Sequence, residues 1–108
     1  MKKKSIVTSY MAISSISGEP AENTHHLIFG GSMRQLADED GLTIPVTAWE
    51  HTAGPVTQRI HDNPMAESLS KILGEIAWEK EFYRRQCTKD DEDPARDAFR
   101  RRYGKNFV

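Results

Sequence analysis

The four histidines of this 108-residue chain lie within one stretch, and two of them are adjacent: His25, His26, His51 and His61. Imidazole accepts a proton near neutral pH and is the commonest nitrogen ligand of metals. Neighbouring side chains of a strand point to opposite faces, so one histidine of the pair would hold a metal while the other positions an attacking water. That division suits phosphodiester hydrolysis, in which the attacking and leaving oxygens lie on opposite sides of phosphorus. By itself, however, an adjacent histidine pair is more often structural.

Short elements are expected to position these histidines. The β-branched and aromatic pattern predicts a strand at residues 24–29, which ends at two glycines, and a second strand at residues 42–46. Between them, a serine cap and a following glycine delimit a short helix at residues 33–39. Residues 4–17 also favour strand, as one or two short segments, although their alternation is imperfect. Residues 47–55 are predicted to be a loop, because Gly-Pro interrupts any regular element there.

The clearest secondary-structure signal predicts a long helix over residues 64–85. Asn63 is a suitable cap and Pro64 suits the first helical position. Asp93 and Pro94 repeat that signal for a final helix that stops at Gly104. The long helix should bury one apolar face, whose members recur at helical spacing: Leu69, Ile72, Leu73, Ile76, Ala77 and Phe82.

Composition limits the class of protein. A chain of this length forms one domain, here taken as residues 1–108, and 37% hydrophobic with 29% charged residues is typical of a globular core of modest size. The single cysteine, Cys87, excludes a disulfide within the chain and a structural zinc site built from cysteines. No apolar run reaches the length of a membrane span, so we expect a cytoplasmic protein with no membrane partner.

The net charge of −1 argues against binding to nucleic acid by charge alone, but cations gather near the C-terminus. Two interpretations remain open for this region. It is either a solvated helix face or a surface that contacts phosphates. The cations are Arg84, Arg85, Arg96, Arg100, Arg101, Arg102 and Lys105.

Several blocks together resemble small phage- and prophage-type HNH endonuclease-like proteins. They are THHLIFGG at residues 24–31, DGLTIP at 40–45, EH at 50–51, IHDN at 60–63 and YGKNFV at 103–108. The resemblance covers roughly residues 24–108. It implies an α+β fold with a ββα-metal motif at about residues 24–86, in which a short β-hairpin packs on the long helix, and a C-terminal helix at about 93–104.

The same resemblance implies roles for individual residues. His26 would be the general base and His25 a metal ligand, with His51 and His61 as the remaining ligands. Arg34 would contact a DNA phosphate, as would Arg100, Arg101 and Arg102 if the C-terminal cations bind DNA. The alternatives are an exposed loop histidine at position 51, a solvent-facing histidine at 61 and a plain surface arginine at 34.

Three departures from the family pattern bear on these roles. The family's cysteine pairs, which bind a structural zinc, are absent. Gly41 stands where the family has the asparagine that gives the HNH motif its middle letter. His51 and His61 are ten residues apart, whereas the tightest motifs place two ligands one helical turn apart, so the chain must loop back to bring them together.

The function expected from this pattern is a metal-dependent DNA endonuclease or nickase of phage or mobile-element type. The working ion would be Mg²⁺ or Mn²⁺, although an imidazole-rich site also accepts Zn²⁺ or Ni²⁺. The main alternative is a catalytically silent relative that binds DNA or protein and self-associates as a homo-oligomer to compensate for a small core. A plain interaction protein with unrelated histidines is the third possibility.

Overall fold

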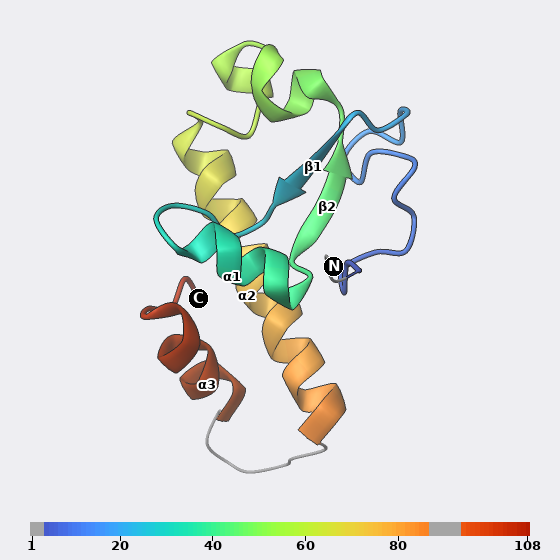
Figure 1. The fold of residues 1–108 in the computed structure, drawn as a ribbon. Helices are drawn as coiled ribbons and strands as arrows, with labels where there is room; N and C mark the ends of the chain where they lie inside the picture. Colours follow the sequence, from blue (N-terminus) through green and yellow to red (C-terminus); the bar gives the residue numbers. More distant parts are fainter. Residues whose placement is uncertain (1–3, 87–93) are drawn as a thin grey trace.

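The computed structural model describes residues 4–86 and 94–108, and its architecture is α+β (Figure 1). Within these residues the main elements are β1 (Asn23–His26), α1 (Met33–Asp40), β2 (Thr43–Val46), α2 (Pro64–Gln86) and α3 (Pro94–Tyr103). The strands form an antiparallel pair joined through α1, and α3 packs beside the second half of α2. None of the described helices has the length and apolar character to cross a membrane.

The register of the strand pair assigns the adjacent histidines to opposite faces. His25 lies opposite Ile44 and His26 opposite Thr43. One further bond, from the Leu27 N–H to the Leu42 carbonyl at 2.9 Å, extends the pairing past the end of β1. The two strands predicted from sequence are therefore present. Behind them lies a core whose buried members come from β2, α1, α3 and the segments next to the strands and before α2: Leu27, Ile28, Ala37, Leu42, Ile44, Val46, Ile60, Phe99 and Tyr103.

The strand predicted within residues 4–17 is wrong. This segment is a series of turns whose only described pairing is an isolated bridge between Ile13 and Pro20. The reason lies in its hydroxyl side chains, which offer the backbone local partners in place of a ladder. The Ser5 hydroxyl accepts the N–H groups of Val7 and Thr8 at 3.0 and 3.3 Å, while donating to the Thr43 carbonyl at 2.6 Å.

The long helix is confirmed, with bounds close to those predicted. Asn63 caps α2, since its side-chain oxygen accepts the Ala66 N–H at 3.3 Å. The helix nevertheless buries a different face from the one predicted. Leu69, Leu73 and Ile76 are exposed in this chain. Three further residues expected in the core are only half-buried: Ile72, Ala77 and Phe82.

The buried face of α2 is instead made of small and polar residues: Ser70, Gly74, Glu75 and Glu79. Buried polar groups are tolerated when each has a hydrogen-bond partner, and these have partners. Ser70 bonds to His25 and to the Leu27 carbonyl. Glu75 and Glu79 both contact Arg96 of α3. Specific polar contacts therefore orient this helix, and its apolar stripe faces outward.

Gly74 allows α2 to approach the end of β1 closely. A Cβ atom at this position would lie 2.7 Å from Cγ1 of Ile28 and 3.1 Å from Cβ of Leu27. We expect Gly74→Ala to destabilise the protein by about 1–3 kcal/mol through overpacking, although alanine in an unconstrained helix is favourable by up to ~1 kcal/mol. Urea unfolding measures the change. A stabilised variant would show that α2 and the strand do not pack this tightly.

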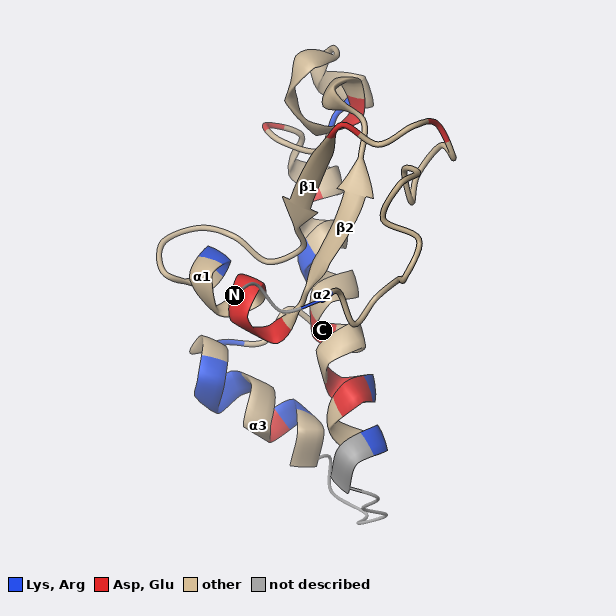
Figure 2. Cartoon of the chain, turned by 45° about the vertical axis from the view of Figure 1, so that its right-hand side comes forward, with Lys and Arg blue, Asp and Glu red and all other residues tan. Residues whose placement is uncertain are grey.

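Helix α3 is confirmed from Pro94 to Tyr103, and the proposed capping residue Asp93 lies outside the described residues. Its Phe99 and Tyr103 rings stack at 4.4 Å. The Tyr103 hydroxyl and the Arg102 guanidinium both bond to Asp40 at the end of α1. Figure 2 shows this acidic end of α1 next to the basic residues of α3. Part of the C-terminal positive charge is therefore neutralised within the fold.

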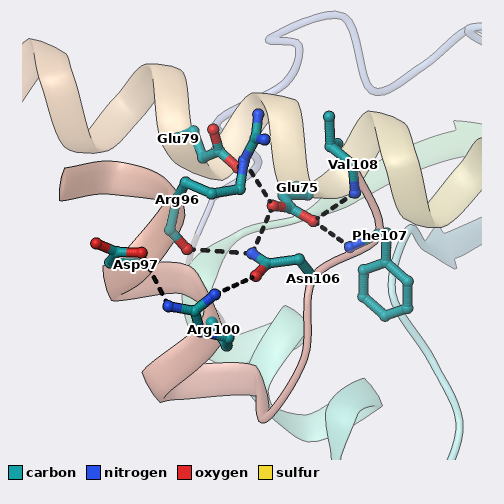
Figure 3. Close-up of polar contacts among 8 residues, drawn as sticks. All are labelled: Glu75, Glu79, Arg96, Asp97, Arg100, Asn106, Phe107 and Val108. Atoms are coloured by element: carbon teal, nitrogen blue, oxygen red, sulfur yellow. Dashed lines mark hydrogen bonds and ion pairs between the residues drawn. The ribbon is translucent and has the colours of Figure 1, made fainter. Parts of the chain in front are cut away.

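The last residues of the chain bind back to α2 through a fully buried carboxylate (Figure 3). Glu75 accepts the backbone N–H groups of Phe107 and Val108 and the side-chain amide of Asn106. The Arg96 guanidinium lies 3.3 Å from the same carboxylate. One buried charge thus connects α2, α3 and the C-terminal tail.

Candidate metal centre

The side chain of His25 is held by α2 in one definite tautomer. Its Nε2 atom lies 2.8 Å from the Ser70 hydroxyl oxygen, and that hydroxyl donates to the Leu27 carbonyl at 2.7 Å. The hydroxyl proton is thereby used, so the oxygen must accept a proton from Nε2 of His25. Nδ1 is then unprotonated. Among the described residues it is buried without a hydrogen-bond partner. A lone pair is therefore available at Nδ1.

His51 is presented by a π-helical turn (Trp49–Ala53), where the sequence predicted an irregular loop. Thr47 and Glu50 exchange the reciprocal hydrogen bonds of a capping box at 2.9 and 3.1 Å, which holds the chain in a helical turn. The Ser14 hydroxyl also donates to Glu50 at 2.6 Å. Burial alone would raise the pKa of Glu50, but these hydrogen bonds hold it below its ordinary value. The pattern Thr47-x-x-Glu50 is a helix-start signal and explains why a helical turn forms here. The prediction of a loop relied instead on Gly54-Pro55.

After this turn the chain returns through a 3-10 turn (Val56–Gln58) and pairs with itself. The Ile60 N–H donates to the Glu50 carbonyl at 2.8 Å, and the His61 N–H to the His51 carbonyl at 3.2 Å. The Arg59 side chain holds the loop closed by donating to the carbonyls of Gly54 and His61, both at 2.9 Å. These bonds bring two histidines ten residues apart next to each other.

Three histidines converge as a result. The Nε2 atoms of His51 and His61 are 3.1 Å apart, and one ring nitrogen from each of His25, His51 and His61 lies within 4.8 Å of the others. Two nitrogens bound to a tetrahedral zinc at 2.0–2.1 Å would be about 3.3 Å apart. The observed spacing of His51 and His61 is close to this value. Within the described residues the three side chains thus form a group able to hold a metal ion.

The surroundings favour the neutral form of His25 and of His51. Burial, and then the neighbouring His51 and His61, lower the pKa of His25 to about 3. Burial and His61 likewise lower the pKa of His51. Neutral imidazole is the form that binds metals. The nearest described carboxylate, from Glu67, is 3.9 Å from Nδ1 of His61. The donor set is therefore nitrogen only, and it suits Zn²⁺ or Ni²⁺ better than Mn²⁺ or Mg²⁺.

His26 lies outside this group. It is on the opposite face of β1, it is buried, and its Nε2 atom is 2.9 Å from Oδ1 of Asp38 on α1. Asp38 lines a hollow of about 440 Å³ between α1, the strands and the N-terminal segment. A carboxylate that holds one nitrogen of an imidazole orients the ring and fixes its tautomer, as in known histidine bases.

The four arginines suggested as phosphate contacts differ in their surroundings. Arg100 pairs with Asp97 at 2.9 Å, and Arg102 pairs with Asp40 at 2.7 Å. Arg34 and Arg101 are exposed and form no ion pair within the described part of the chain. The C-terminal arginines therefore support the fold as well as offering charge to the surface.

One cation near the histidine cluster, Lys71, was not predicted from the sequence. The Lys71 ammonium lies 4.8 Å from the centre of the Phe29 ring, and that ring is 4.9 Å from the ring of His61. Among the described residues Lys71 forms no ion pair. No sequence pattern indicated a role for Lys71, Ser70 or Asp38, because each gains its neighbours from a distant element.

Comparisons with family models, with curated proteins and with solved structures find no match to this chain.

Proposed function

We propose that this protein is a metal-dependent DNA endonuclease or nickase with an HNH-type site. The observation that carries the proposal is the unpaired Nδ1 of buried His25, whose ring lies 5.3 and 5.2 Å from the rings of His51 and His61. Leaving a buried polar atom without a partner costs roughly 1–3 kcal/mol, so its presence is better explained by a ligand than by packing. The resemblance of the surrounding sequence to HNH proteins gives the ion its proposed use.

Each residue then has a proposed task. His25, His51 and His61 hold the divalent ion, with Ser70 fixing the tautomer of His25. When bound, the ion would stabilise negative charge on the leaving oxygen of a phosphodiester. His26, oriented by Asp38, accepts a proton from water. Lys71 and Arg34 supply positive charge for the phosphates of DNA.

Cleavage is the first test. Purified protein should nick or cleave plasmid DNA when supplied with Mn²⁺ or Mg²⁺, and EDTA should stop the reaction. Zn²⁺ and Ni²⁺ are included because the nitrogen donors suit them. A His51→Ala preparation, made in parallel, controls for contaminating nucleases. Absence of cleavage across duplex, branched and single-stranded DNA with all four ions would contradict the nuclease proposal.

A specific observation favours a second candidate, a silent relative that binds DNA or protein. The proposed base, His26, lies on the face of β1 opposite the three clustered histidines. The three clustered histidines come from β1, a π-helical turn and the turn that precedes α2, so a metal there would also join these segments structurally. In that case metal would raise the melting temperature while no DNA is cut.

A further inference from the structure

Four large apolar side chains form one exposed stripe on α2. They are Met65 at 74% exposure, Leu69 at 58%, Leu73 at 44% and Ile76 at 49%. At 3.6 residues per turn they fall within about a quarter of the helix circumference, and the stripe extends for roughly 17 Å. Monomeric proteins seldom expose a contiguous apolar surface of this kind. The stripe lies opposite the polar face that α2 buries against its own chain.

The charges at the two ends of the stripe complement each other. Lys80 is exposed just beyond Ile76, while Asp62, which pairs with Arg59 but keeps a side chain 77% exposed, lies at the other end. If a second α2 packs antiparallel on the stripe, Met65 of one copy meets Ile76 of the other. Lys80 of each copy then lies near Asp62 of its partner. A parallel arrangement would instead place like charges together. The stripe is therefore complementary to itself under a two-fold axis, which is the commonest symmetry of protein dimers.

The surface next to the stripe also leaves room for a second chain. A groove of about 790 Å³ lies between α2 and residues 4–9, and Leu73, Ile76 and Lys80 form part of its wall. A neighbouring helix seated on the stripe would place side chains in this groove. Burial of the stripe would also give its four side chains the apolar contacts that they lack in the single chain.

From these observations we infer that the protein forms a homodimer through antiparallel packing of α2 against α2, centred near Leu69 and Leu73. This inference is independent of the metal chemistry. It also explains why α2 buries a polar face in the single chain and exposes an apolar one. In the dimer both faces are buried, one by polar contacts within the chain and the other by apolar contacts between chains.

Sedimentation equilibrium of the full chain tests the inference. The wild type, of 12.3 kDa, should approach twice that mass as its concentration rises. Leu69→Glu should raise the dimer dissociation constant by at least about tenfold, because it places a charge at the centre of the interface. Ile16→Glu is a matched control, since Ile16 is 57% exposed but lies in the N-terminal segment, and it should leave the mass unchanged.

A second variant tests the antiparallel orientation. Lys80→Glu should weaken the dimer, because the new carboxylate would face Asp62 of the partner, and high salt should recover part of the loss by screening. Circular dichroism confirms that each variant is folded. A monomeric wild type at all concentrations, or a dimer that Leu69→Glu weakens no more than Ile16→Glu does, would overturn the inference. If Lys80→Glu strengthens the dimer, the helices do not pack antiparallel. If the protein is a monomer that binds an unrelated protein through the stripe, the stripe is not the site for a second copy of the chain.

Discussion

Replacing Glu75 by alanine is expected to destabilise the protein by about 3–5 kcal/mol, a large part of the 5–15 kcal/mol that holds a domain of this size together. The carboxylate is fully buried. Its removal leaves the N–H groups of Phe107 and Val108, the Asn106 amide and one side of Arg96 without their acceptor (Figure 3). Urea unfolding at one fixed protein concentration measures the loss.

Glu79→Gln is the matched control for this variant, since it changes the neighbouring carboxyl group. Burial and a hydrogen bond to Glu75 raise the pKa of Glu79 to about 7, and the protonated carboxyl donates to Glu75. A glutamine amide donates in the same way, so Glu79→Gln should keep most of the stability. A loss with Glu75→Ala no greater than with Glu79→Gln would show that the C-terminal tail contributes little to stability.

The Glu75–Glu79 pair should also make the stability of the protein depend on pH. The pKa of Glu79 is raised above its ordinary value of 4.5, so its contribution to stability is complete below pH 4.5 and is lost as the pH rises through about 7. Burial alone would raise the pKa of Glu75, but its hydrogen bonds from Glu79, the C-terminal tail and Asn106 lower it. The contribution of Glu75 to stability is therefore lost only at acidic pH. Glu79→Gln should remove the loss above neutral pH.

The sequence predicted where the main helices and strands lie better than which way they face. Asn63 and Pro64 mark the start of α2 by local capping chemistry, which needs no knowledge of the rest of the chain. The buried face could not be predicted in this way. Hydrophobic periodicity indicated Leu69 and Leu73, whereas the face is decided by Ser70 and by Glu75, whose partners lie elsewhere in the chain.

The candidate site shows the same limit. The residue type pointed to His25, His51 and His61, and the structure brings these three together. Their meeting depends on the paired backbone of residues 50–51 and 60–61 and on the Arg59 side chain, none of which has a sequence signature. The separation of His26 from the group follows more simply, because neighbours on a strand face opposite ways.

The adjacent histidines should therefore differ when each is changed to alanine. His25→Ala removes a nitrogen of the cluster, so it should weaken Zn²⁺ or Mn²⁺ binding by more than the 10–100-fold typical of an outer partner of a metal ligand. Ser70→Ala, which removes only the bond that fixes the tautomer of His25, should fall within that range. Raising the metal concentration should restore part of the activity of both variants. Calorimetric titration gives the affinities.

His26→Ala should leave metal affinity nearly unchanged, because His26 is bound to Asp38 on the other face of β1. As the proposed base, it should still lower single-turnover cleavage by about 10²–10⁴-fold, and added metal should not restore the rate. If His25→Ala and His26→Ala lose metal equally, the two side chains share one coordination sphere. If neither loses metal, His51 and His61 bind the ion without them. A wild type that binds no divalent metal would contradict the metal centre itself, and a His26→Ala variant that cleaves at the full rate would transfer the role of base to another group.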